Sequence, residues 1–301
     1  LPNVSIGYTG GNTAVHTNGT KLGYIYSVNY SNSRAVSERE RTEFDIVKRA
    51  TYDYFTTNYD EKNNLSALLN LTYSYGKSKI SLKNLFNNTF VKTVGIRNGI
   101  NMENDEGNEF NIKSVNTEVT GNGLANSVLE GLHRIGKDWT IDWNGSFAYT
   151  YKNQPDQKIL TLRNNFLNEE RYYLKLNNDN SPEIRNAGRV YSYLNETIYG
   201  ASANATKQFR WLNQVQKLKF GTMNYYRNRE VQVEGLGYAT LKSVGSKDIV
   251  ETKTNTFNNF FSNEAIDDYQ LTVANIEANS AEYKGTALLN SGYLMLDNKF
   301  S

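Results

Sequence analysis

Apolar and polar residues alternate along residues 139–152, whose sequence is WTIDWNGSFAYTYK. Side chains of a β-strand point alternately to its two faces, so this stretch would have one apolar and one polar face. A helix of the same sequence would spread its rings around the axis and would have no apolar stripe. The pattern therefore predicts a strand. The apolar face would carry Trp139, Ile141, Trp143, Gly145, Phe147, Tyr149 and Tyr151, and the polar face Asp142, Asn144 and Ser146.

The same alternation recurs at residues 22–30, 65–75, 80–83 and 191–205. It is less regular near the end, where the two parities both carry apolar residues: Tyr283, Ala287, Leu289, Tyr293 and Met295 on one, Leu288, Leu294 and Leu296 on the other. Before residue 65 the segment SRAVSERERTEF (33–44) fits either a loop or a charged extension of a strand. We expect about 12 antiparallel strands, and therefore an all-β protein.

The connections between the expected strands are of two kinds. Tight turns are expected at 75–79, 135–139 and 209–217, and long polar loops at about 88–108, 153–189 and 234–282. From residue 65 onward the two kinds alternate. Outer-membrane β-barrels have this asymmetry, with short turns at one end and long loops at the other. Each membrane strand would need about 9–11 residues.

Soluble β-sandwiches and β-helices also have alternating strands and polar loops. Three observations favour a membrane barrel. The apolar faces are rich in Tyr and Trp, which suit the headgroup level of a bilayer. The expected strands are longer than the 5–6 residues common in soluble sheets, and their opposite faces are very polar. The candidate lipid-facing aromatics are Trp139, Trp143, Phe147, Tyr149 and Tyr151, with the polar face turned to the lumen.

The amino-acid composition excludes several classes of protein. The 301 residues have a mean hydropathy of −0.64, yet 13% are aromatic, which argues against disorder. A net charge of +2 gives no basic field for nucleic acid. Cysteine is absent, which excludes disulfide staples and thiolate chemistry. The first residues, LPNVSIGY, lack the features of a signal peptide, and we expect the chain to be a piece of a longer protein.

The sequence contains little that points to catalysis or to a metal. His16 and His133 have no partners at metal-ligand spacing, and no nucleophile, phosphate or dinucleotide motif is present. We therefore expect no enzyme activity, no cofactor and no metal. The carboxylates of NMENDEGNEF (101–110) could ligate Ca²⁺, but their spacing is not that of an EF-hand, and a solvated loop is favoured. Arg227 and Arg229 share a parity and could meet phosphate or a ligand carboxylate, although a hydrated surface is favoured.

Aromatic residues also occur in the expected long loops, where receptors capture their ligands. Such rings can stack on sugars or peptide side chains, but they can equally pack one loop against another. The candidate ligand contacts are Phe166, Tyr172, Tyr173, Phe260, Phe261 and Tyr269.

Four segments resemble, in the same order, strands of a known family. They are NNLSALLNLTYSYGKSKISLKNLFNNTF (63–90), EGLHRIGKDWTIDWNGSFAYTYKNQPD (130–156), KLKFGTMNYYRNREV (217–231) and AEYKGTALLNSGYLMLDNKFS (281–301). Together they resemble barrel strands of the TonB-dependent outer-membrane receptors of Bacteroidetes. The first 62 residues fit only by their alternation, and the loops match no known pattern. The turn at His133, followed by Arg-Ile-Gly, also departs from the plainer turn expected.

The resemblance implies a protein of the Gram-negative outer membrane that takes up a nutrient actively. It implies a barrel of 22 strands filled by a globular plug. Residues 1–301 would then be one part of a single barrel domain, without the plug and the last strands. The implied partners are outer-membrane lipid, TonB bound through an N-terminal region, a surface lipoprotein lid, and a substrate that is an oligosaccharide, a peptide or a metal chelate. The alternative is a soluble or surface-exposed β-rich binding module, such as an adhesin or a carbohydrate binder.

Overall fold

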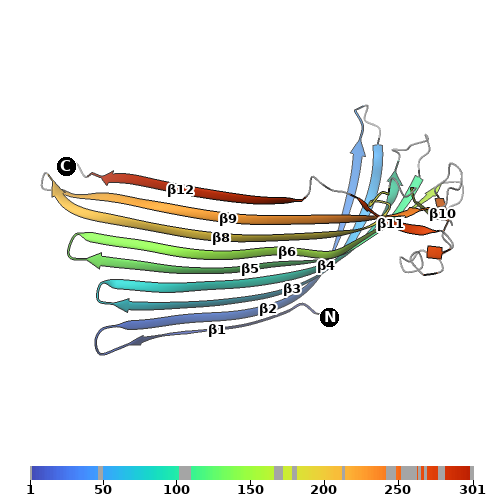
Figure 1. The fold of residues 1–301 in the computed structure, drawn as a ribbon. Coiled ribbons are helices and arrows are strands. Elements are labelled where there is room, and N and C mark those ends of the chain that lie inside the picture. The colour runs from blue at the N-terminus through green and yellow to red at the C-terminus, as the bar shows by residue number, and fades with distance from the viewer. Residues whose placement is uncertain are drawn as a thin grey trace.

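The computed structural model describes residues 2–46, 50–101, 110–165, 172–177, 182–211, 214–241, 249–251, 263, 266–267, 270–276 and 282–298. These residues form twelve strands of one antiparallel sheet (Figure 1). The strands are β1 (Val4–Val15), β2 (Lys21–Phe44), β3 (Ala50–Tyr75), β4 (Ser78–Asn101), β5 (Phe110–Ile135), β6 (Trp139–Asn165), β7 (Tyr173–Lys175), β8 (Ala187–Trp211), β9 (Gln214–Thr240), β10 (Ile249–Glu251), β11 (Leu271–Ile276) and β12 (Tyr283–Asp297). The predicted all-β class and the strand number are confirmed.

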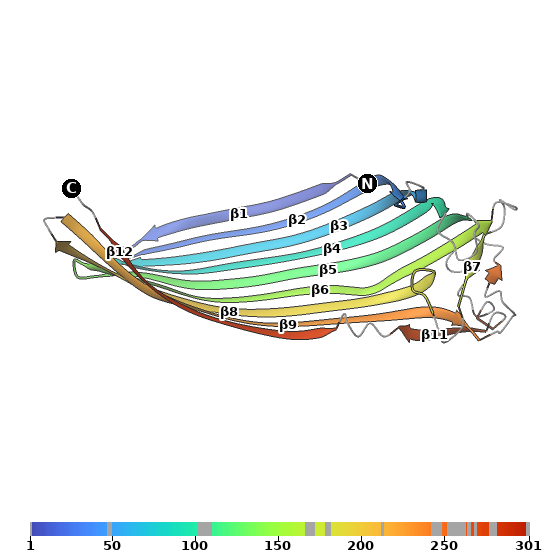
Figure 2. The same ribbon diagram turned by 90° about the horizontal axis from the view of Figure 1, so that it is seen from above.

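Neighbouring strands in the sequence are also neighbours in the sheet, in the order β1-β2-β3-β4-β5-β6-β8-β9. β11 and β12 both pair with β9, β11 with residues 235–240 and β12 with residues 217–231. The short β7 pairs with β6 and with β10. The sheet is a single curved layer, and within the described residues β1 and β12 are not joined to each other (Figure 2). The chain therefore forms an open segment, as expected for part of a barrel.

The turns are short at one end of the sheet, where β3 meets β4 and β5 meets β6 (Figure 1). Gly76 and Gly136 lie in these two turns with φ of 54° and 64°, a conformation that glycine adopts without steric cost. The predicted tight turns at 75–79 and 135–139 are confirmed. The third tight turn, predicted at 209–217, is shorter than predicted, because β8 continues to Trp211 and β9 begins at Gln214.

The predicted long loops are wrong over much of their length. β4 extends to Asn101, β6 to Asn165 and β9 to Thr240, so the strands have 24–27 residues where 9–11 were expected. The segment 33–44 is likewise a charged extension of β2. In these parts polar residues also occur on the apolar side of the strands, such as Lys92 and Asn98 in β4, so the hydrophobic alternation that identified the other strands is weaker there.

Residues that lie opposite each other in neighbouring strands share one face of the sheet. The register therefore connects the apolar sides of all the long strands into one apolar face, which runs from β1 to β12. Its members include Tyr8, Val28, Leu69, Phe86, Leu129, Trp143, Phe147, Tyr199, Phe220 and Leu294. The opposite polar face includes Thr9, Ser27, Asn70, Lys83, Glu130, Asp142, Asn144, Asn204 and Arg229.

The last strand reverses the parity that the sequence favoured. Leu288, Leu294 and Leu296 pair with residues of the apolar face of β9. Tyr293 lies on the polar face, where its hydroxyl donates to Asn204 Oδ1 at 2.8 Å. The register to β9 decides the orientation of this strand, because both of its parities carry apolar residues.

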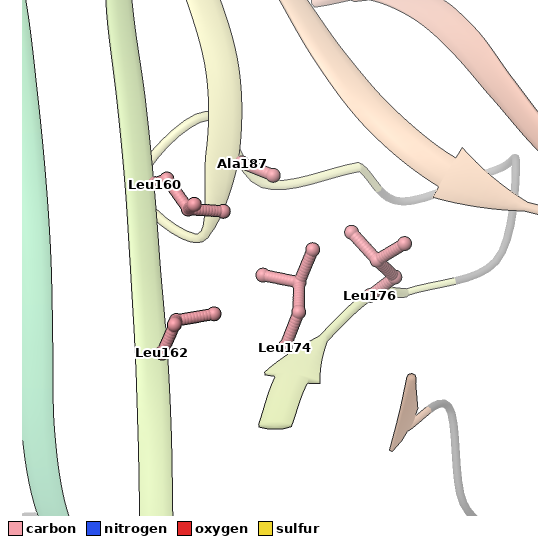
Figure 3. Packing of buried hydrophobic residues seen from close by; sticks show 5 residues of the cluster. All are labelled: Leu160, Leu162, Leu174, Leu176 and Ala187. Atoms are coloured by element: carbon pink, nitrogen blue, oxygen red, sulfur yellow. The ribbon is translucent and has the colours of Figure 1, made fainter. Parts of the chain in front are cut away.

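The described residues bury few large apolar side chains. One cluster lies near the loop end and joins β6, β7 and the start of β8 (Figure 3). Its members are Leu160, Leu162, Leu174, Leu176 and Ala187. Elsewhere the apolar face is exposed, with 45% of Leu69, 40% of Phe86 and 52% of Tyr199 accessible. No helix of the described part is long and apolar enough to cross a membrane.

Candidate functional site

A cavity of about 720 Å³ lies on the polar face near the loop end of the sheet. Its walls come from β3, β4, β5, β6 and the segment that precedes β8. The lining residues are Tyr52, Tyr54, Thr56, Asn58, Gly95, Arg97, Asn101, Phe110, Ile112, Ser114, Asn116, Gln157, Ile159, Thr161, Arg163, Arg185 and Asn186. We call it the mouth cavity.

The strand register brings the lining residues together. Thr56 lies opposite Arg97, Arg97 opposite Ser114, and Ser114 opposite Thr161, so one row of partners crosses four strands. Ser114 and Thr161 also share a hydrogen bond between their hydroxyls at 3.0 Å. Paired strands therefore hold this wall of the cavity.

A β-bulge in β6 decides which of its residues face the cavity. The register to β5 and β8 shifts between residues 154 and 157, where β6 has one residue more than its partners. Because side chains alternate between the two faces of a strand, one extra residue reverses the face to which every later side chain of that strand points. Gln157, Thr161 and Arg163 consequently face the cavity, whereas Leu160 and Leu162 turn to the other face.

Hydrogen bonds from side-chain amides hold the bulge. Gln154 Nε2 donates to Gln157 Oε1 at 3.0 Å and to Glu118 Oε2 at 3.2 Å. Gln157 Nε2 donates to Asn116 Oδ1 at 3.0 Å. Pro155 has no N–H to donate to a ladder, which suits this irregular position. Hydrogen bonds with neighbouring side chains thus stabilise the bulge.

Two stacked tyrosines and Arg97 line the β3 side of the cavity, and Arg41 lies next to Tyr52 outside the lining. The rings of Tyr52 and Tyr54 are 4.5 Å apart with 7° between their planes. The guanidinium of Arg97 lies 5.3 Å from the Tyr54 ring, and that of Arg41 lies 5.3 Å from the Tyr52 ring. Arg97 Nε also donates to Thr56 Oγ1 at 3.2 Å. Cation–π contact with the rings thus helps to fix the position of both guanidinium groups.

The Tyr52 hydroxyl donates a hydrogen bond to Glu43 Oε2. This bond raises the pKa of Tyr52, because losing the proton would place two negative oxygens together. Tyr52 therefore stays neutral and serves as a hydrogen-bond donor and ring surface.

The other side of the cavity carries Arg163 and Arg185. Arg163 lies 4.6 Å from the Phe110 ring, and its Nη2 donates to Asn186 Oδ1 at 3.3 Å. Arg185 Nε donates to Glu183 Oε2 at 2.7 Å. This bond is the largest cause that lowers the pKa of Glu183, so Glu183 carries its negative charge beside the cavity.

Among the described residues, the charged side chains that line the cavity are all positive. The described lining residues include three arginines and no carboxylate. Arginine forms a planar fork of donors that matches carboxylate and phosphate groups. The arrangement is therefore suited to an anionic group, with neutral hydroxyls and amides around it.

Of the predicted loop contacts, only Tyr172 and Tyr173 belong to the described residues, and they lie away from the lining of this cavity. Tyr172 packs against the cluster of Leu160, Leu162, Leu174, Leu176 and Ala187, and Tyr173 begins β7. Neither is among the lining residues. Phe166, Phe260, Phe261 and Tyr269 lie outside the described residues, as do 102–109 of the predicted acidic loop. Their role in ligand binding stays a prediction.

The predicted lipid-facing aromatics share the apolar face as expected. Trp139, Phe147 and Tyr149 are 37%, 39% and 37% exposed. Trp143 and Tyr151 lie over glycines of β5, Gly131 and Gly123, where a Cβ atom would collide with the rings. The five rings therefore form part of one exposed apolar surface, and lipid contact stays a prediction.

The two predicted arginines of β9 are held on the polar face by one carboxylate. Arg229 Nε lies 2.5 Å from Glu196 Oε2, and Arg227 Nε lies 3.9 Å from the same oxygen. They form an ion pair between β8 and β9. Among the described residues no group of three His, Asp or Glu side chains could hold a metal ion.

Sequence reasoning missed the mouth cavity because its residues lie in segments assigned to loops or to an uncertain region. The repeated Tyr at positions 52 and 54 was a usable signal, since residues two apart share a face of a strand. A scan against protein-family models and a search of curated proteins find no match for this chain.

Proposed function

We propose that this chain is part of the barrel of a TonB-dependent outer-membrane receptor that takes up a nutrient actively. The observation that carries the proposal is the continuous apolar face, which spans all the long strands and is exposed over its middle rows. Soluble monomers rarely expose contiguous apolar patches larger than a few hundred Å². In an outer membrane this face would contact lipid acyl chains.

The polar face supports the same proposal. Cross-strand bonds join its charged and amide groups, such as Lys83 Nζ to Glu130 Oε1 at 2.7 Å and Asn204 Nδ2 to Asp142 Oδ2 at 2.6 Å. Such a face would line a water-filled or plugged lumen. The short turns at one end would then be periplasmic, and the mouth cavity would open toward the outside.

The soluble binding module fits the structure less well. A sandwich would cover the face of Trp139 and Trp143 with a second sheet, and the described residues form only one layer (Figure 2). The described apolar cluster includes Leu160 and Leu162 near the end of β6, whereas Trp139 and Trp143 lie at its beginning.

The proposal is tested on the full-length protein, refolded from urea into detergent and into lipid vesicles. A folded outer-membrane barrel should migrate differently on a gel before and after boiling, and should resist protease in vesicles. A protein that stays monomeric in water without detergent and shows no such shift would contradict the proposal. Uptake is then tested by deleting the gene and by deleting TonB, which should abolish growth on the same nutrient.

A further inference from the structure

We propose that the mouth cavity binds an acidic oligosaccharide, a substrate class that rests on the proposed receptor function. Three features of the cavity lead to this ligand: the sign of its charges, the state of its aromatic rings, and the neutral groups that complete its lining.

Arg97 supplies the charge that an anion in the cavity would meet. Arg185 is offset by Glu183, whose Oε2 lies 2.7 Å from Arg185 Nε. Among the described residues no carboxylate forms an ion pair with Arg97, whose contacts are the Thr56 hydroxyl and the Tyr54 ring. A positive charge without a counterion at the wall of a cavity favours binding of an anion.

The aromatic rings hold the arginines and do not offer an open stacking platform. Tyr52 and Tyr54 stack on each other, and each has a guanidinium over it. A sugar ring that stacked on these faces would have to displace those contacts. The rings therefore position charge, which points to recognition through anionic groups more than through apolar sugar faces.

The remaining lining favours a ligand rich in hydroxyl groups. The neutral side chains that can donate or accept hydrogen bonds there include Thr56, Asn58, Asn101, Ser114, Asn116, Gln157, Thr161 and Asn186. A cavity of about 720 Å³ lies in the range of sites for organic ligands of several rings. A single phosphate or sulfate ion would contact only a small part of this lining.

The test measures binding by titration calorimetry to the full-length protein in detergent at pH 7. The probes are trigalacturonate, which has three carboxylates, maltotriose, which is neutral and has the same number of rings, and citrate, which has three carboxylates and no sugar ring. We expect trigalacturonate to bind at least about 10-fold more tightly than either of the others, and to bind more weakly as salt is raised.

Two matched variants locate the site. Arg97→Gln should weaken trigalacturonate binding by about 10- to 100-fold, the usual effect of losing a charge-assisted hydrogen bond. Arg34→Gln makes the same chemical change on the opposite face, where Arg34 pairs with Glu61 at 3.0 Å, and it should leave binding unchanged. Equal effects of the two variants would overturn the proposal.

The proposal is also overturned if maltotriose or citrate binds as tightly as trigalacturonate. This comparison uses the wild-type protein, so it decides the matter even if Arg97→Gln lowers the folded fraction. The boiling-dependent gel shift of the same samples separates the two proposals. A folded, heat-modifiable protein that prefers maltotriose contradicts the ligand class alone, and a protein without the shift contradicts the receptor function.

Discussion

The carboxylate of Asp156 accepts two hydrogen bonds from the guanidinium of Arg189, Nε to Oδ1 at 2.8 Å and Nη2 to Oδ2 at 2.7 Å. This pair joins the β6 bulge to β8, beyond the exposed apolar part of the sheet. The hydrogen bonds from Arg189 are the largest cause that lowers the pKa of Asp156. The pair therefore stabilises the bulge on which one wall of the mouth cavity depends.

Asp156→Asn should destabilise the protein by about 1–2 kcal/mol at pH 7, a range that allows for solvent screening of the partly exposed pair. The side chains of Arg189 and Asp156 are 34% and 27% exposed. Chemical unfolding in lipid vesicles measures the loss. The double variant with Arg189→Gln should cost less than the sum of the two single variants, because both remove the same interaction. Additive costs would show that the pair contributes nothing.

The same pair predicts a dependence on acid pH. The pKa of Asp156 is lower in the folded protein than in the unfolded chain, so its contribution is complete above the unfolded value of about 4. It is lost as the pH falls through the folded pKa. The stability difference between wild type and Asp156→Asn should therefore be full at pH 6–7 and shrink below about pH 4. A difference that stayed constant to pH 2 would contradict this account.

Leucine-to-arginine substitutions distinguish the two faces of the sheet. Leu69 on the apolar face and Leu85 on the polar face are 45% and 40% exposed, so their exposure is comparable. In a membrane barrel, Leu69→Arg should cost about 2–4 kcal/mol, the cost of an arginine near the bilayer midplane, while Leu85→Arg should be tolerated. Folding yield in vesicles measures both. In a soluble module the two substitutions would have similar, small effects.

Glycine-to-alanine substitutions test the packing of Trp143. A Cβ atom at Gly131 would meet the Trp143 ring, whereas a Cβ atom at Gly145 would have no heavy atom within 4 Å. Gly131→Ala should displace the ring and break the hydrogen bond from Trp143 Nε1 to His133 Nε2, which is 3.1 Å long. We expect a cost of about 1–3 kcal/mol and a changed tryptophan emission spectrum. Gly145→Ala, on the same face, should change neither.

Leu174→Ala tests the cluster beneath β7. Leu174 has no exposed surface, and its short strand pairs only with β6 and β10 in the described part of the chain. Losing such contacts costs about 2–5 kcal/mol in a well-packed core. Here the loss should destabilise the segment around β7 and leave the rest of the sheet unaffected. We expect faster protease cleavage between β6 and β8 with little change in global unfolding. Leu241→Ala, at a position that is 59% exposed, should leave cleavage unchanged.

The central part of the sheet could be predicted from the sequence because the two faces of its strands differ so clearly. Trp139 to Tyr151 show this alternation without interruption, and the structure confirms their strand and their shared face. The short turns at Gly76 and Gly136 were also recognisable, since glycine and polar residues interrupt two apolar runs there.

The outer part of the strands and the mouth cavity could not be predicted in the same way. Around Tyr52 and Arg97 both faces carry polar or charged residues, so the sequence lacks the alternation of apolar and polar residues by which a strand is recognised. The bulge at Pro155 and Asp156 changes the face to which Arg163 points. This change is visible only in the pairing of β6 with β5. In β12, leucines on both parities left the orientation to the register with β9.

The length of the strands has a consequence for how the cavity binds. A strand of 26 residues such as β3 is about 85 Å long, nearly three times the thickness of a bilayer core of about 30 Å. The described walls of the cavity are therefore mostly paired backbone, fixed before a ligand arrives. Binding to such a wall does not have to order a loop first, which avoids an entropic penalty of about 1–2 kcal/mol for each residue that would become fixed. Selectivity would then depend on the match between a rigid surface and its ligand, and a ligand of the wrong shape or charge could not be accommodated by local rearrangement.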